Sequence, residues 1–252
     1  MRSEQQTLSL VKASYEPLVS AARARFTSGE ALASMLTPDV APERLELFFI
    51  HFCAFGVQMT EPVDGWIRRA GARCTALGLG DLGRSLIAHA KHEAGHHLMM
   101  IADTRKLVAG WNERRSFRLD ADELLALPAT PGIARYAALH EQVIAGSAPH
   151  GQLAIEYEIE RLSVTAGPAV LGQCASVLGR EALAGLSFLE EHVAVDAGHT
   201  KFNEVQLERL LSEHPDFAAP LGAAGSGALD AYAAFLADCV AHADARLRSR
   251  AA

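Results

Sequence analysis

The sequence has few aromatic residues and few runs of β-branched residues, and no segment alternates with the period of a strand. Aromatic residues make up 6% of the 252 residues, whereas alanine and leucine recur throughout the chain. This composition favours helices over strands. Apolar residues recur with helical spacing in about eight segments, so the sequence predicts an all-α protein.

Closely paired cysteines are also absent. The four cysteines are far apart and form no C-x-x-C pair: Cys53, Cys74, Cys174 and Cys239. This spacing argues against a zinc knuckle or a disulfide framework and fits a reducing compartment. The first residues lack the apolar core of a signal peptide, and no stretch reaches the roughly 18 apolar residues of a membrane span. We therefore expect a cytoplasmic protein with no membrane partner.

An excess of basic residues is the third absence. The chain has 23 Lys and Arg against 30 Asp and Glu, a formal net charge of -7. A protein that grips a nucleic-acid backbone usually presents a basic face, so this balance argues against a nucleic-acid partner. With 50% hydrophobic residues the chain can bury a full core. No change in composition marks a boundary, so residues 1–252 are expected to form a single domain.

The spacing of apolar residues, together with the polar, glycine and proline residues that interrupt it, predicts the boundaries of the helices. Residues 111–131 are polar and then proline-containing, which indicates a connection with one short helix. The GAAGSG stretch is expected to precede the last helix. The predicted helices span residues 3–26, 42–61, 63–77, 81–108, 132–145, 150–166, 168–178, 180–212 and 228–248.

Six of the 11 histidines lie in two clusters, each on a long predicted helix. His89, Glu93 and His96 are spaced i, i+4, i+7, and the same spacing relates His192, Asp196 and His199. On a helix these positions fall within an arc of about 60°, so three side chains face the same way. One such triad alone is more often a solvated face or a set of hydrogen-bonded histidines. Two triads on largely apolar helices predict a metal site, because burying these groups without partners would cost several kcal/mol.

Two further helices offer acidic ligands. Glu61 ends an otherwise apolar helix, and Glu156 and Glu160 lie one turn apart on one face. Carboxylates from facing helices are the usual ligands of a dimetal site in a bundle. The charges of two divalent ions would be balanced by four acids, and mixed nitrogen and oxygen ligation suits iron or manganese better than structural zinc. These acids are Glu61, Glu93, Glu160 and Asp196, with nitrogen ligands from His96, His192 and His199.

The late H-x-x-x-D-x-x-H motif follows a glutamate by 32 residues, and a histidine-bearing helix lies about 60 residues before that glutamate. This pattern resembles the haem-oxygenase-like diiron oxidases, which are relatives of the thiaminase TenA and the pyrroloquinoline-quinone synthase PqqC. The resemblance covers residues 61–199. It implies a single-domain haem-oxygenase-like bundle of about seven or eight helices. The metal ligands that it implies are Glu61, Glu93, His96, Glu160, His192, Asp196 and His199.

Three details of the motif refine the resemblance. The stretch from Tyr157 to Glu160 is similar to one that precedes the central glutamate of PqqC-like members, which favours Glu160 over Glu156. His89 stands where some members have a glutamate, so His89, Glu93 or both are candidates on that helix. Val170 occupies the position of a lysine in the member that builds para-aminobenzoate, so that self-sacrificing reaction is disfavoured.

The resemblance implies an O2-dependent oxidoreductase with two Fe(II) ions, with manganese as an alternative metal. O2 would be activated through a peroxo-bridged intermediate, with Glu93 as a bridging or mobile carboxylate. The substrate would be a small amine or an amino-acid-derived metabolite of a biosynthetic pathway. N-oxygenation, desaturation and oxidative C–C cleavage are the candidate outcomes, and an external electron donor is compatible with them.

Two alternatives keep the fold but change the function. One is a metal-free TenA-like hydrolase or PqqC-like cofactorless oxidase, and the other is a non-catalytic helical protein that binds metal. Because twofold dimers are the commonest soluble oligomers, a homodimer is expected.

Overall fold

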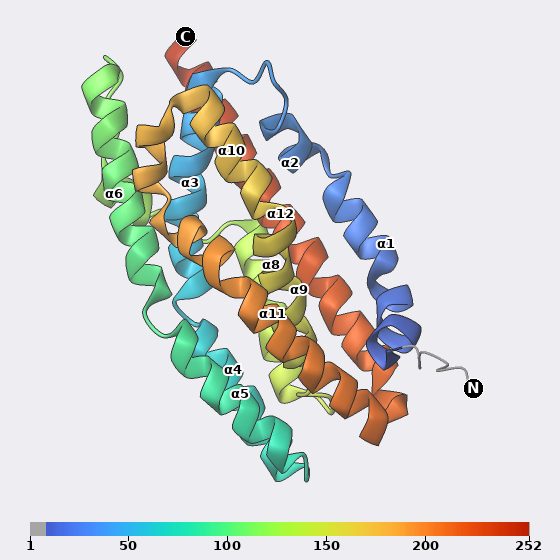
Figure 1. Ribbon diagram of the computed structural model, residues 1–252. Coiled ribbons are helices and arrows are strands. Elements are labelled where there is room, and N and C mark those ends of the chain that lie inside the picture. Colours follow the sequence, from blue (N-terminus) through green and yellow to red (C-terminus); the bar gives the residue numbers. More distant parts are fainter. Residues whose placement is uncertain (1–8, 252) are drawn as a thin grey trace.

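The computed structural model describes residues 9–251, and every regular element in that range is a helix (Figure 1). The all-α prediction is therefore confirmed. The elements are a π-helix at Val11–Tyr15, α1 (Glu16–Thr27), α2 (Glu30–Met35), α3 (Pro42–Thr60), α4 (Val63–Ala76), α5 (Gly80–Glu93), α6 (His96–Arg114), α7 (Ala121–Leu125), α8 (Pro131–Ala145), α9 (Gly151–Thr165), α10 (Gly167–Leu178), 3-10 turns at Arg180–Gly185 and Pro215–Phe217, α11 (Ser187–Glu213) and α12 (Ala218–Ala251).

The centre of the bundle is built on α3 and α12. Thirteen of the 19 residues of α3 are buried. A helix that is apolar on nearly all sides has to be surrounded by others, and α3 packs against α6, α7, α8, α10 and α12. The long helix α12 runs beside α1, α3, α8 and α9 (Figure 1). The buried apolar side chains form one continuous cluster.

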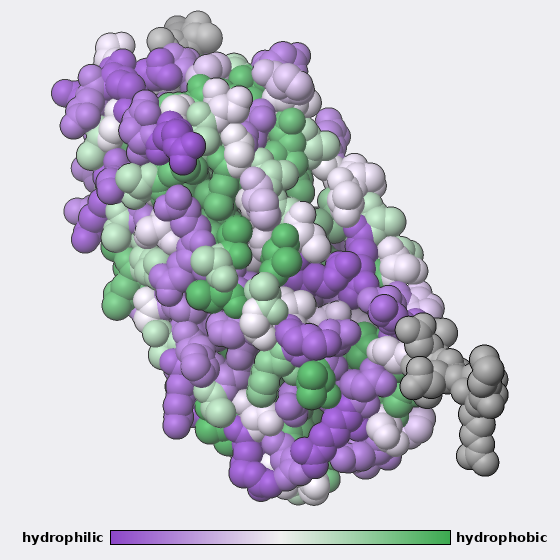
Figure 2. All heavy atoms as spheres, in the orientation of Figure 1, coloured by the Kyte–Doolittle hydropathy of each residue, from purple (hydrophilic) through white to green (hydrophobic). Residues whose placement is uncertain are grey.

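Two pairs of helices matter most for the site. Helix α11 packs along α9 and also contacts α6, whereas α4 and α5 form a hairpin whose main contact with the rest of the bundle is that of α4 with α8. Within the described residues, no helix is both long and apolar enough to cross a membrane. Figure 2 shows hydrophilic and apolar side chains interspersed over one face of the bundle.

The predicted helix over residues 81–108 is wrong, because the structure divides it at Ala94 and Gly95. Gly95 has φ +93, a left-handed conformation that favours glycine, and Ala94 is extended. His89 and Glu93 therefore lie on α5 and His96 opens α6. The three residues of the first triad therefore do not share one face of one helix. Those of the second triad do, because His192, Asp196 and His199 lie on the unbroken helix α11.

The other boundary errors have local causes. The GAAGSG stretch lies inside α12 rather than before it, because its glycines admit close neighbours: a Cβ on Gly225 would collide with the Tyr15 hydroxyl. Helix α6 continues to Arg114, past the predicted end at residue 108. The helix predicted over 180–212 starts with a 3-10 turn, and α2 was not predicted. Of the helix predicted over 3–26, residues 3–8 lie outside the described residues.

Candidate metal centre

Helices α5, α6, α9 and α11 bring together two overlapping groups of ligand-type side chains that share Glu93. One group is Glu93, His96 and His192, and the other is His89, Glu93 and Glu160. Within each group, one donor atom per residue lies within 4.8 Å of the others. A carboxylate has two oxygens and can contact two ions at once. Each group could therefore hold one metal ion, with Glu93 as the residue that the two groups share.

The break between α5 and α6 places Glu93 beside His96. Because α5 ends at Glu93 and α6 begins at His96, the chain turns between them and Nδ1 of His96 lies 3.0 Å from Oε2 of Glu93. This contact is the leading reason why the pKa of His96 is raised. Burial acts to raise the pKa of the Glu93 carboxyl, but the hydrogen bond from His96 and the nearby histidines outweigh it and lower that pKa.

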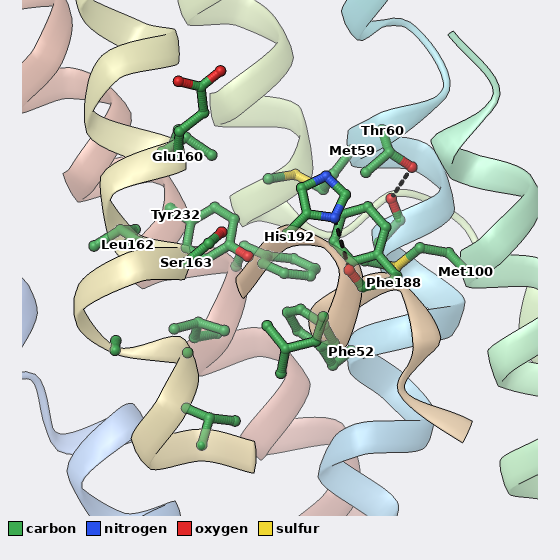
Figure 3. Close-up of a pocket in the computed structure, with 18 of the residues that line it drawn as sticks. Phe52, Met59, Thr60, Met100, Glu160, Leu162, Ser163, Phe188, His192 and Tyr232 are labelled. Atoms are coloured by element: carbon green, nitrogen blue, oxygen red, sulfur yellow. Dashed lines mark hydrogen bonds between the residues drawn. The ribbon is translucent and has the colours of Figure 1, made fainter. Parts of the chain in front are cut away.

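His192 is held by the first turn of α11. Its Nδ1 donates to the carbonyl oxygen of Phe188 at 2.7 Å, as Figure 3 shows, which directs the lone pair of Nε2 away from the backbone. Asp103 of α6 fixes that turn, because it accepts from the Ser187 hydroxyl at 2.7 Å and from the Phe188 N–H at 2.9 Å. Burial lowers the pKa of His192, so the ring is neutral and suited to bind a metal ion.

Several buried donor atoms at the centre have no hydrogen-bond partner. Nε2 of His89 lies 2.9 Å from Oε1 of Glu160, without the alignment of a hydrogen bond. Nδ1 of His199 lies 3.3 Å from Oδ1 of Asp196 and 3.9 Å from Oε1 of Glu160. Unpaired buried polar atoms cost free energy, and cations would satisfy them together. The atoms are His89 Nε2, Glu160 Oε1, Asp196 Oδ1 and Oδ2, and His199 Nδ1.

Two acids of the centre, Glu156 and Asp196, are held in an environment that resists ionisation. Burial is the leading cause that raises the pKa of Glu156 to about 8 and that of Asp196 to about 7, and neighbouring carboxylates add to both shifts. Burial opposes charge on His89 too, but Glu160 raises its pKa to about 9. A divalent cation would reverse the penalty on the carboxylates by supplying the missing positive charge. The donor set therefore fits metal ions.

Neighbouring amides orient two of the acids. Asn203 donates to Oε2 of Glu160 at 2.6 Å, and Gln152 donates to Oε1 of Glu156. The Gln152 amide also lies within 3.1 Å of Nδ1 of His140. Sequence reasoning missed these amides, although each continues a helical stripe, because Asn203 follows Asp196 by seven residues and Gln152 precedes Glu156 by four.

Most of the predicted ligands come together, but Glu61 does not. Six of the seven gather where α5, α6, α9 and α11 meet, and the alternatives His89 and Glu156 gather with them. Glu61 is exposed at the end of α3, outside both groups. Its neighbour Thr60 faces the interior, and one residue corresponds to a rotation of about 100° around the helix. The six predicted ligands in place are Glu93, His96, Glu160, His192, Asp196 and His199.

A cavity of about 130 Å³ adjoins these side chains. Figure 3 shows Glu160 and His192 among its walls, together with Phe52, Phe188 and Tyr232. Its polar part consists mainly of the candidate ligands and its remaining walls are mostly apolar. A small organic molecule bound there would therefore meet the metal-binding groups in a largely dry environment.

Two solved structures share this architecture. One is a domain of unknown function with a haem-oxygenase-like fold from Shewanella denitrificans, 18% identical, covering 93% of each chain with a TM-score of 0.68. The other is a TenA homolog from Pseudomonas syringae, 14% identical, covering 92% of each chain with a TM-score of 0.65. No family model and no curated protein matches the sequence. The haem-oxygenase-like fold implied by the sequence motif is thereby confirmed.

Proposed function

We propose that this chain is a non-haem dimetal oxidase that uses O2 to oxidise a small organic molecule, an amine or an amino-acid derivative. The observation that carries the proposal is the pair of ligand groups sharing Glu93, whose neighbours include buried donor atoms without partners. Two Fe(II) ions are the proposed metals, with manganese as the alternative, since mixed nitrogen and oxygen ligands suit both. An external electron donor is part of this proposal.

The charge of the site supports two divalent ions. The buried cluster has four acids even without Glu61, because Glu156 lies within electrostatic range of His89, Glu93 and Glu160. Four carboxylates offset the four positive charges of two divalent cations. We therefore place Glu156 in the set in place of Glu61.

The residues of the chain have distinct tasks in this scheme. Bound ferrous ions would supply electrons for the reduction of O2. His96 and His192 would hold one side of the pair, His89 and Glu160 the other, and Glu93 would join them. Asn203 holds Glu160 in place, and the apolar walls keep water from the reacting atoms.

The metal-free hydrolase alternative needs a nucleophile such as a thiolate. All four cysteines are buried and none lines the cavity. Burial raises the pKa of the Cys74 and Cys174 thiols to about 12 and holds that of Cys53 and Cys239 well above its ordinary value. The cysteines therefore do not favour this alternative. A role in metal binding alone leaves unexplained why the cluster adjoins an apolar cavity.

Metal content and O2 consumption test the proposal together. Protein loaded anaerobically with Fe(II) is expected to retain about two ions per chain and to consume O2 when it is admitted. Glu93→Gln should lose both properties, whereas Glu191→Gln should keep both, because Glu191 is exposed on α11 one residue before His192. Folded wild-type protein that retains no iron, or that keeps its full activity after chelation, would refute the proposal.

A further inference from the structure

The residues that line the cavity extend along most of α3. Phe48 and Thr60 both line it, and they are separated by 12 residues of that helix. At about 1.5 Å per residue this corresponds to about 18 Å. A volume of about 130 Å³ spread over such a length leaves room for an extended chain and not for a broad ring system. An engineered cavity of similar volume, about 150 Å³, holds benzene when it is compact.

The end of the cavity away from the metal centre is apolar. Its aromatic walls pack on one another, with ring centroids 6.2 Å apart for Phe48 and Phe52, and 5.8 Å apart for Phe52 and Phe235. Phe26 of α1, Leu32 of α2 and Val170 of α10 also line the cavity. Such walls bind CH2 groups through burial of apolar surface.

No lysine or arginine lines the cavity in the part of the chain that the structure describes. The hydroxyl of Thr60 is already used, because it donates to the carbonyl oxygen of Gly56 at 3.0 Å. The other hydroxyl groups of the wall, those of Tyr136, Ser163 and Tyr232, carry no charge, so among the described residues a charged group on a bound molecule would find compensation at the cluster around Glu93. This leaves one polar end and one apolar end, which together specify the shape of a ligand.

We propose that the substrate carries an unbranched apolar chain, which lies along the cavity towards Leu32 and Val170, and a single polar head, which lies at the metal centre. The position of the head rests on the proposed function, whereas that of the chain rests on the cavity alone. The cavity thus selects for chain length, and Val170 is a residue that determines specificity. This narrows the proposed amines and amino-acid derivatives to amphipathic molecules with an apolar chain and a single charged head, either an amine or a carboxylate.

Binding of two homologous series tests the inference directly. Straight-chain carboxylic acids and straight-chain amines of about 4 to 14 carbons would be titrated by calorimetry into the metal-free protein and into the Mn(II)-loaded protein. Each added methylene is expected to tighten binding about fourfold, the equivalent of about 0.8 kcal/mol, until the chain reaches the end of the cavity. The series that gains affinity from Mn(II) identifies the head group. Affinity that does not change with chain length would overturn the inference.

Blocking the apolar end provides the matched variants. Val170→Trp, or Leu32→Trp if the first does not fold, should move the plateau to shorter chains without changing metal content. Val195→Trp is the control, because Val195 is exposed on α11. A plateau unchanged by both cavity variants would also overturn the inference. Iron binding without chain-length dependence would refute only this inference, whereas chain-length dependence without iron binding would refute only the proposed dimetal function.

Discussion

Replacing Asp196 by asparagine is expected to stabilise the metal-free protein and to weaken metal binding. Asp196 is 1% exposed, and its polar neighbours, Nδ1 of His199 at 3.3 Å from Oδ1 and Ser163, do not compensate for its burial. Its pKa is raised from 3.8 in a free chain to about 7, chiefly by burial. The folded state therefore prefers the protonated form. Above pH 7 it bears a penalty of at most about 4 kcal/mol, from about three pKa units at 1.36 kcal/mol each.

The sign of the pH dependence follows from this shift. The penalty shrinks as the pH falls below 7 and is gone below about pH 4, where the carboxyl is protonated in both states. A neutral amide at this position would carry no such penalty, so Asp196→Asn should raise the free energy of unfolding at pH 8 and raise it less at pH 5.5. Saturating Mn(II) should narrow the difference at pH 8, since metal at 100 times its Kd stabilises the wild type by about 2.7 kcal/mol, less than the full penalty of about 4 kcal/mol.

Urea unfolding at both pH values, with chelator and with Mn(II), measures all four differences. Glu191→Gln serves as the control, because Glu191 is an exposed acid on the same helix. If Asp196→Asn is less stable than the wild type at pH 8 in chelator, the metal-free fold already satisfies this carboxylate. The buried oxygens of Asp196 would then no longer indicate a bound cation.

Three further predictions concern other parts of the chain. Glu156→Gln is expected to lower iron retention severalfold and Glu61→Gln to leave it unchanged; elemental analysis showing the reverse would restore Glu61 as a ligand. Gly95→Ala should lower the free energy of unfolding by about 1–2 kcal/mol because of its φ of +93, whereas Gly65→Ala on α4, which also has open space around it, should raise it by about 0.5–1 kcal/mol. Equal effects in urea unfolding would contradict this reasoning. Burial lowers the pKa of His51 to about 4, so the unfolded chain binds a proton at this residue more readily than the folded protein does. His51 therefore costs no stability above pH 6.5, and about 3 kcal/mol of unfolding free energy is lost as the pH falls towards 4. His51→Leu should flatten the fall in unfolding free energy between pH 7 and pH 5, and an unchanged slope would count against it.

The sequence predicts the second half of the site better than the first. His192, Asp196 and His199 lie on one unbroken helix, so a count of residues along the helix places them correctly. The same count fails for His89, Glu93 and His96, because the chain leaves the helix at Gly95 and starts a new helix, α6. A glycine within a helix costs only about 1 kcal/mol, so periodicity alone does not reveal whether the chain continues through it. Whether the helix continues depends on tertiary packing, here that of α6 against α3 and α11.

The position of Glu61 outside the cluster of candidate ligands shows a second limit of sequence reasoning. A shift of one residue turns a side chain by about 100°, so the direction of a residue at a helix end depends on where the helix stops. Glu156 lies in the middle of α9, where that uncertainty is small. The GAAGSG stretch reads as a linker by composition, yet it continues α12 because small residues let α1 and α8 approach.

The α4–α5 hairpin gives the centre a mechanical consequence. Helix α5 packs mainly on α4, yet it supplies the candidate ligands His89 and Glu93. The candidate ligands Glu160 and His192 come from α9 and α11, which belong to the body of the bundle. Metal ions bound between them would fasten the hairpin to that body, as a cross-link does. Without metal, α5 would still contact α11 through side chains, by the ion pair of Asp81 with Arg209 and the hydrogen bond from Ser85 to Gln206, so the junction of the hairpin with the bundle is expected to be weaker but not lost.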